Sequence, residues 1–181
     1  MDNIKLLILS DTHGHIENLI TLFSWAKDLL PPNDKIMTSA FLGDGITDLN
    51  YAANTAGFYS DWKVVRGNND FTSSLSSFTV FELNGHRFFI CHGHRHGVNS
   101  GASRLIGAAR ENSANVALFG HTHVPFNKTV NGITLINPGS VGQARSRLGE
   151  TFALCECRPG KPLKTKFWNI SRWGKITQIK I

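Results

Sequence analysis

The chain has few cysteines and no long apolar run. Three of its 181 residues are cysteines, Cys91, Cys155 and Cys157, and they form no CxxC pair. This number and spacing favour neither a disulfide framework nor a zinc finger. We expect Cys155 and Cys157 to be small packing residues on one face of a strand. The sequence also contains no run near the ~18 apolar residues of a membrane span, no Walker loop and no nucleophile elbow.

Acidic residues are scarce at the C-terminal end. Residues 151–181 carry seven basic side chains against one acid, Glu156, which accounts for the net charge of +6. Such a segment can attract polyanions, including nucleic acid. We favour a second interpretation, in which these lysines form the wet face of half-buried antiparallel strands. The composition, 41% hydrophobic and 18% charged, is that of an ordinary globular protein, and the length predicts one domain over 1–181.

One pattern recurs along the chain: an apolar run of strand length ends at a side chain that can bind a metal ion. The first run, residues 4–10, leads into Asp11 and His13. Four later runs lead, in order, to Asp44, Asn68, His92, and the pair His121 and His123. An open α/β sheet that gathers its active site along one edge would produce this pattern.

The N-terminus shows no secretion signal. Asp2 stands where a signal would be basic, and the apolar run behind it continues directly into Asp11. Cleavage there would remove two candidate ligands, so we expect a cytoplasmic protein with no membrane partner.

Spacing predicts the secondary structure. Helical periodicity predicts helices over 15–30, 48–56 and 102–112. Strands are predicted over 4–10, 36–42, 62–66, 78–83, 87–91, 116–120, 126–130 and 133–136, with paired antiparallel strands in the remainder. Asn84-Gly85 and Asn131-Gly132 predict two hairpins, because Asn-Gly favours the type I′ turn. Parallel βαβ units followed by meandering strands predict two packed sheets with helices outside, an α/β sandwich.

Histidines are clustered. Seven of the eight fall in three short loops, each behind a predicted strand, and only His86 stands apart; we assign structural roles to His86 and His15. Two divalent ions ~3.5–4 Å apart activate water and stabilise the charge of a reacting phosphodiester. Mixed imidazole and oxygen donors suit manganese, iron, zinc or nickel better than magnesium or calcium. We therefore predict two divalent metal ions, with manganese the first choice.

The motifs also carry a family resemblance. Asp11-x-His13, Gly43-Asp44, Gly67-Asn68-x-Asp70, His92-Gly93-His94 and Gly120-His121-x-His123 stand in that order over about residues 4–141. This set resembles the calcineurin-like metallophosphoesterase superfamily. The short chain and Asn137-Pro138-Gly139-Ser140 make it similar to the small YfcE-type phosphodiesterases. The resemblance implies a four-layer α/β/β/α sandwich of two mixed sheets with a binuclear metal centre. It implies one ion on Asp11, His13 and His123, another on Asn68, His92 and His121, and Asp44 as the bridge between them.

The sequence departs from the larger superfamily at Asn69, where the family has a histidine that protonates the leaving group or steadies the phosphate. Asparagine can donate a hydrogen bond but cannot act as a general acid, and losing such an acid commonly costs ~10²–10⁴ in rate. Small members of the YfcE type also often lack this histidine and are associated with diesters. His94 is the substitute we expect, and with Asn69 it would orient the phosphate. His96 is a weaker candidate that we expect to be exposed.

We therefore predict a binuclear-metal phosphodiesterase that hydrolyses small or nucleotide-derived phosphodiesters through a metal-bridging hydroxide. A first alternative is a non-catalytic metal-binding interaction scaffold, since the superfamily includes a retromer subunit of that kind. A second is a nuclease acting on nucleic-acid ends, which we do not favour. Relatives of this size are often oligomeric, so a homo-oligomer is open. Trp168 and Trp173 could serve such an interface, but we expect both to pack against the second sheet.

Overall fold

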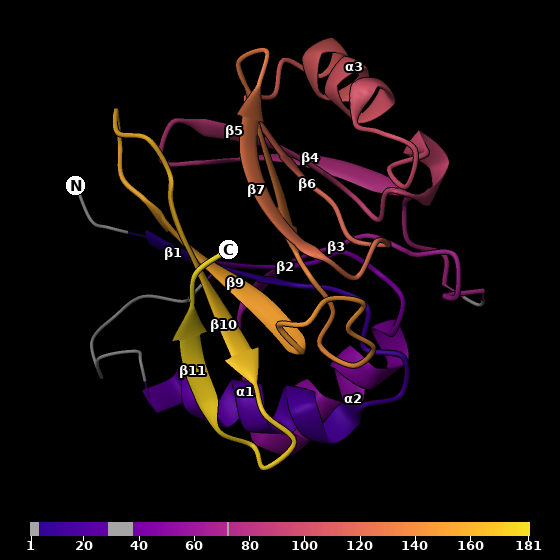
Figure 1. The fold of residues 1–181 in the computed structure, drawn as a ribbon, viewed down its shortest axis with the longest axis vertical. Helices are drawn as coiled ribbons and strands as arrows, with labels where there is room; N and C mark the ends of the chain where they lie inside the picture. The colour runs from indigo at the N-terminus through magenta and orange to yellow at the C-terminus, as the bar shows by residue number, and fades with distance from the viewer. Residues whose placement is uncertain (1–3, 29–37, 72) are drawn as a thin grey trace.

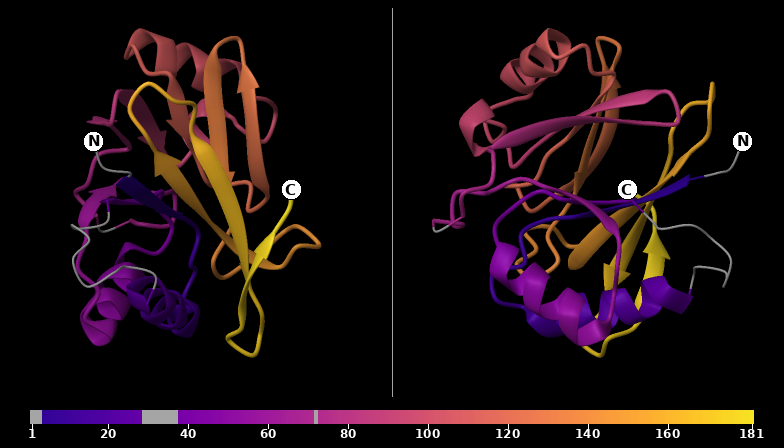
Figure 2. Two further views of the ribbon diagram at one scale, coloured as in Figure 1. Left: turned by 90° about the vertical axis from the view of Figure 1, so that its left-hand side faces the viewer. Right: turned by 180° about the vertical axis from the view of Figure 1, so that it is seen from behind.

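Two sheets form the centre of the molecule. The structure is a computed structural model that describes residues 4–28, 38–71 and 73–181. The predicted end of the first helix at 29–30 and start of the second strand at 36–37 lie outside these residues. The helices are α1 (Ile16–Asp28), α2 (Ile46–Ala56) and α3 (Ser103–Glu111), with a short 3₁₀ turn η1 (His94–His96). α1 and α2 lie at one end of the molecule and α3 at the other, with the sheets between them (Figures 1 and 2).

The first sheet has six strands in the order β11-β10-β9-β1-β2-β3. These strands are β1 (Ile4–Leu9), β2 (Thr38–Phe41), β3 (Asp61–Val64), β9 (Glu150–Cys157), β10 (Lys164–Ile170) and β11 (Ile176–Ile179). β1, β2 and β3 are parallel, as a βαβ chain requires, while β9, β10 and β11 are antiparallel and join the free edge of β1. The last third of the chain therefore returns to complete the sheet that the first third began.

The second sheet has five strands in the order β4-β5-β6-β8-β7. Its strands are β4 (Phe78–Leu83), β5 (His86–Cys91), β6 (Val116–Leu118), β7 (Pro125–Val130) and β8 (Ile133–Pro138). Both predicted hairpins are confirmed, between β4 and β5 and between β7 and β8. Asn84, Gly85, Asn131 and Gly132 all have positive φ, as a type I′ turn requires.

Alternation along β1 creates two separate cores. Leu7 and Leu9 face α1 and α2, whereas Leu6 and Ile8 face the second sheet. α3 covers the other face of the second sheet, where Leu105 packs with residues of β5 and β6. The predicted four-layer α/β/β/α sandwich is thus confirmed. Cys155 and Cys157 lie in the core between the sheets, as predicted, and burial raises the pKa of both thiols to about 12.

Three expectations about placement were wrong. The strands that end at candidate ligands belong to both sheets, β1, β2 and β3 to the first and β5 and β6 to the second, so they do not share one sheet edge. Trp168 packs on Trp25 of α1, with ring centroids 4.8 Å apart, on the helix side of the first sheet. Trp173 lies between β10 and β11 and is 82% exposed, so it does not pack against the second sheet. Charge and periodicity do not distinguish the two faces of a strand that is covered on both.

The interpretation we favoured for the C-terminal lysines holds in part: Lys164 and Lys166 lie in β10, whereas Lys161 and Lys175 lie in the connections on either side of it. In β10, Phe167 and Ile170 are buried while Lys164 is exposed, and Lys166 pairs with Glu156 at 3.1 Å. Among the described residues no helix is long and apolar enough to cross a membrane.

Candidate metal centre

The candidate ligands stand on tight turns directly behind their strands. Positive φ angles, which only a few non-glycine residues adopt, occur at five of them: Asp11, His13, Asp44, His121 and His123. Such backbone costs about 1–3 kcal/mol per residue and concentrates at functional sites. Neighbouring chain segments also approach very closely. A Cβ atom on Gly67 would collide with the carboxylate and the backbone nitrogen of Asp44. The turns are thus packed together in one strained cluster.

Asp11 lies at the centre of this cluster. Its side chain is fully buried, and one oxygen, Oδ2, accepts hydrogen bonds from the Ser10 hydroxyl and the His121 backbone N–H. The other oxygen, Oδ1, has no hydrogen-bond partner among the described residues. Instead it faces the Nε2 atoms of His123, His13 and His92, at 3.1, 3.7 and 3.8 Å.

The tautomers of two of these imidazoles follow from their other contacts. Nδ1 of His92 lies 2.7 Å from the Leu42 carbonyl oxygen, and Nδ1 of His123 lies against the Gln143 carbonyl oxygen. Because a carbonyl oxygen only accepts, each Nδ1 must carry the proton, and each Nε2 of the neutral ring presents a lone pair. Backbone carbonyls commonly orient metal-binding histidines in this way. Lone pairs and carboxylate oxygens therefore converge on one point, which a cation would stabilise.

Asp44 faces the same point from the end of β2. Its Oδ2 lies 3.4 Å from Nε2 of His92 and 3.7 Å from Nε2 of His13. Asn69 holds this carboxylate from behind, donating from its backbone N–H to Oδ1 at 2.8 Å and from its side-chain amide to Oδ2 at 2.7 Å. The predicted phosphate-orienting residue therefore contacts the predicted bridging carboxylate in this structure.

Close contacts between carboxylates and imidazoles shift the pKa values of the cluster. Burial alone would raise the pKa of Asp11, but the adjacent imidazoles of His123 and His13 outweigh it and hold that pKa below its usual range. Burial would also raise the pKa of Asp44, but His92 outweighs this effect and the pKa of Asp44 is lowered. The Asp11 carboxylate raises the pKa of His13. Burial would lower the pKa of His92, but Asp44 and Asp11 outweigh burial, so this pKa lies above its usual value.

The remaining candidates lie around His92. Asn68 places its side-chain oxygen 3.1 Å from Nε2 of His92. The rings of His121 and His94 lie 5.1 and 5.3 Å from that of His92, measured between centroids. Burial lowers the pKa of His121 and of His94, and the charge of His92 adds to this effect. All nine predicted site residues thus lie in one neighbourhood, and His121 contacts the Asp11 carboxylate through its backbone N–H, at 3.1 Å.

Two overlapping groups of donors could hold an ion. Their ligand atoms lie within 4.8 Å of one another: Asp11 with His13 and His123, and Asp11 with Asp44 and His92. The first group is the predicted set for one ion. The second combines a predicted bridging carboxylate with one predicted ligand of the other ion, and Asp11 is common to both. Buried nitrogen and carboxylate donors with an unpartnered oxygen at their centre fit a divalent transition metal.

Histidines outside the cluster have other environments. His15 is exposed, and His86 stands at the start of β5, near Phe88. The expectation that His96 is exposed was wrong: it is half-buried, and its ring packs edge-on against Phe89 at 5.7 Å. The η1 turn, which the sequence did not predict, directs this side chain into the protein.

Asp70 is a supporting residue whose role the sequence did not reveal. Its carboxylate accepts four backbone hydrogen bonds. Oδ2 accepts from the N–H groups of Asp44 and Gly67, at 2.7 and 2.8 Å, and Oδ1 from those of Gly45 and Ile46, at 2.9 and 3.0 Å. It therefore fixes the turn that carries Asp44 and also satisfies the first N–H groups of α2, which has no side-chain cap of its own. Only its position in the Gly67-Asn68-x-Asp70 motif marked it.

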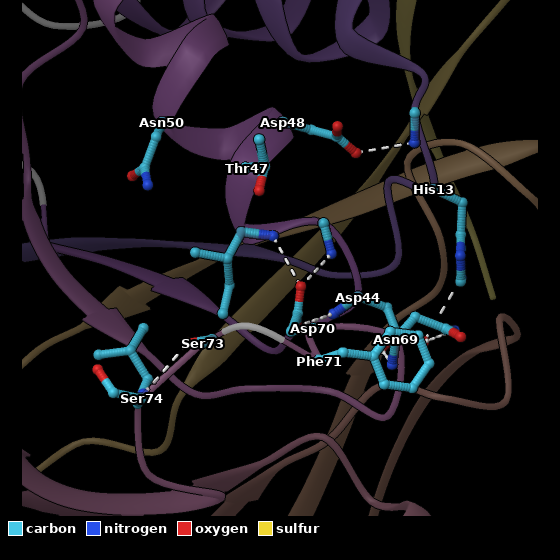
Figure 3. Close-up of a pocket in the computed structure, with 14 residues that line it drawn as sticks. His13, Asp44, Thr47, Asp48, Asn50, Asn69, Asp70, Phe71, Ser73 and Ser74 are labelled. Carbon is cyan, nitrogen blue, oxygen red and sulfur yellow. Dashed lines mark hydrogen bonds and ion pairs between the residues drawn. The ribbon is translucent and has the colours of Figure 1, made fainter.

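A pocket of 570 Å³ opens beside the cluster. His13, Asp44 and Asn69 of the cluster are among the residues that line it. The first turns of α2 line one side, and the loop that follows β3 lines the other (Figure 3). The cluster is therefore accessible to a small molecule from this side.

Comparison with known proteins identifies the class. The chain belongs to the calcineurin-like phosphoesterase superfamily, whose domain profile matches residues 4–160. It is 31% identical over 140 residues to a probable metallophosphoesterase of Mycoplasma pneumoniae, which covers 76% of this chain and 79% of that protein. It is 26% identical over 155 residues to the phosphodiesterase MJ0936 of Methanocaldococcus jannaschii, with 75% and 82% covered.

Solved structures share the fold. A predicted phosphoesterase from Streptococcus pneumoniae superposes with a TM-score of 0.74 at 24% identity, covering 99% of this chain and 98% of that one. Vps29 of Entamoeba histolytica, in complex with Zn²⁺, superposes with a TM-score of 0.73 at 21% identity, covering 98% of each chain. The family and fold predicted from the sequence motifs are confirmed.

Proposed function

We propose that this chain is a phosphodiesterase that requires two divalent metal ions and hydrolyses small or nucleotide-derived phosphodiesters. Water is added across one P–O ester bond, which gives a phosphomonoester and an alcohol. The observation that supports this most directly is the buried, unpartnered Oδ1 of Asp11, which faces the Nε2 atoms of three histidines. A hydrogen-bonded core would not leave a carboxylate oxygen in this state.

Each residue of the cluster has a role in this proposal. Asp11, His13 and His123 would hold one ion, Asn68, His92 and His121 the other, and Asp44 would lie between them. Bound divalent ions supply an activated water and neutralise the charge of the phosphate. Carbonyl contacts on His92 and His123 keep their Nε2 atoms aimed inward. Manganese is the ion to test first, with iron, zinc and nickel as alternatives.

The same residues predict that the enzyme prefers substrates with good leaving groups. Asn69 cannot give up a proton, and its amide is engaged with Asp44. Burial lowers the pKa of His94, which favours the neutral imidazole, and in that form it can orient a phosphate through one N–H but is a poor general acid. We therefore expect aryl diesters to react much faster than alkyl diesters.

Metal reconstitution tests this function. Purified protein is analysed for metals, stripped, and assayed with bis(4-nitrophenyl) phosphate and 4-nitrophenyl phosphate after addition of each ion. We expect no turnover without metal, and Mn²⁺-dependent hydrolysis of the diester in preference to the monoester. Asp44→Asn should lose metal and activity, whereas the matched control Asp61→Asn, on an exposed side chain paired with Lys63, should keep both. Full activity in Asp44→Asn would refute the metal role of this residue.

A second candidate function is a metal-binding interaction scaffold, because several of the structural neighbours are Vps29 proteins. Against it, all seven predicted ligands are present in this chain. Two tightly bound ions without turnover of any phosphoester would favour the scaffold. Cleavage of oligonucleotides in preference to small diesters would instead favour a nuclease.

A further inference from the structure

The pocket beside the cluster has an apolar side that no predicted ligand uses. Phe71 is 83% exposed, and Leu75 is 40% exposed. Both line the pocket, together with Ile46 from the start of α2. An exposed phenyl ring in the lining of a pocket beside the candidate metal centre offers a flat surface on which an aromatic group can stack.

The charge of the pocket limits what it can accept. Among the described residues that line it, none is lysine or arginine, whereas Asp48 and Asp70 are present. Asp48 accepts hydrogen bonds from the Thr12 hydroxyl and the Gly14 N–H, which fix its carboxylate in the wall of the pocket. A second phosphate would be repelled here, because nothing in the lining compensates its charge. The pocket therefore suits an uncharged group.

Polar side chains surround the apolar surface. Asn50 and Thr47 are exposed on α2, and Ser73 and Ser74 stand opposite them on the loop (Figure 3). Hydroxyl and amide groups of this kind can bind the polar edge of a base or a ribose. The volume of 570 Å³ lies within the range of small-molecule sites, ~300–1,000 Å³.

The loop that presents Phe71 is anchored at several points. Arg66 donates from its backbone N–H to the Ser76 carbonyl at 3.0 Å and from its guanidinium to the Ser73 carbonyl at 3.4 Å. The N–H of Ser73 in turn donates to the Asp70 carbonyl at 3.2 Å. Because Asp70 also holds the turn of Asp44, the wall of the pocket and the cluster are positioned by one residue.

We propose that this pocket binds one ester group of the substrate, an uncharged planar group such as an aryl ring or a nucleoside, with Phe71 stacked on its flat face. This inference rests on the proposed function and deepens it, since it defines the substrate class. It favours small diesters and nucleotide-derived diesters over a nucleic-acid strand, whose next phosphate would enter the acidic pocket.

Kinetics of Phe71 variants test the proposal. With Mn²⁺-loaded protein and bis(4-nitrophenyl) phosphate, Phe71→Ala should raise KM about tenfold with little change in kcat, as expected for loss of one stacking contact. Phe71→Trp should keep the wild-type KM. The matched control Tyr59→Ala, on an aromatic residue that is 85% exposed and outside the pocket lining, should change neither constant. An unchanged KM in Phe71→Ala would overturn the proposal and leave the proposed function intact.

A binding measurement distinguishes failure of the pocket proposal from failure of the proposed function. If wild-type protein hydrolyses no phosphoester with any metal, the proposed function fails, and the pocket is tested by titrating adenosine into labelled protein and following its NMR resonances. Shifts at Phe71 and Leu75 in wild-type protein, with the Leu75 shift lost in Phe71→Ala, would support the pocket. No shifts, or stronger competition by a short oligonucleotide than by the nucleoside, would overturn it.

Discussion

Replacing Asp70 by asparagine should weaken the turn that carries Asp44. Each carboxylate oxygen of Asp70 accepts two backbone N–H groups, so an amide of either orientation turns its NH₂ group toward two donors. Two hydrogen bonds to a charged acceptor are lost, each worth about 1.5–3 kcal/mol. The total, about 3–6 kcal/mol, is a large share of the ~5–15 kcal/mol that stabilises a typical domain.

Asp48→Asn is the matched control. Thr12 and Gly14 both donate hydrogen bonds to the same oxygen of Asp48, Oδ2. The amide can therefore keep its oxygen on these donors and turn its NH₂ group away, and we expect a loss of about 1–2 kcal/mol.

Urea denaturation of the two variants and wild type, with and without Mn²⁺, measures the free energies of unfolding. Asp70→Asn should also bind Mn²⁺ more weakly than Asp48→Asn, because the turn of Asp44 is no longer fixed. An Asp70→Asn protein as stable as Asp48→Asn would refute the reasoning.

Two further predictions concern packing and protons. Gly67→Ala should destabilise the protein by several kcal/mol and reduce metal content, since its Cβ would collide with Asp44. Gly107→Ala, in α3, should be neutral or slightly stabilising, because its Cβ would meet no described atom within 4 Å beyond its chain neighbours and the nearby backbone of its own helix. Thermal melts of both variants measure the difference. The affinity for Mn²⁺, measured by calorimetry, should fall as the pH drops through the pKa values of His13 and His92, which are raised above the usual histidine value near 6.5. The reason is that a proton on either Nε2 must leave before a metal binds. An affinity that is constant from pH 8 to pH 5 would contradict this prediction.

Local patterns carried much of the fold. Apolar runs, helical periodicity and Asn-Gly turns concern residues that are close in sequence, and these elements form near the predicted positions. Pairing between distant segments was harder to derive. Nothing in β9 indicates that Leu154 pairs with Leu7 of β1, and for this reason the side of the sheet that Trp168 covers was predicted wrongly.

The residues of the site also fall into those that the sequence reveals and those that it does not. Asp, Asn and His residues directly behind apolar runs are visible in the sequence, because strand ends deliver them to one place. The supporting groups are not visible, since they act through backbone atoms. The carbonyl oxygens of Leu42 and Gln143 orient two imidazoles, and any residue type offers such a carbonyl. Phe71 was also missed, because only the folded loop shows that its ring is exposed beside Asp44.

Electron paramagnetic resonance of metal-free protein titrated with Mn²⁺ is the most direct measurement of whether two ions share this cluster. Two ions per chain and a spin-coupled spectrum are expected, because ions that share the Asp44 carboxylate would lie ~3.5–4 Å apart. A single bound ion, or two ions that give the uncoupled six-line signal of isolated Mn²⁺, would contradict a binuclear centre.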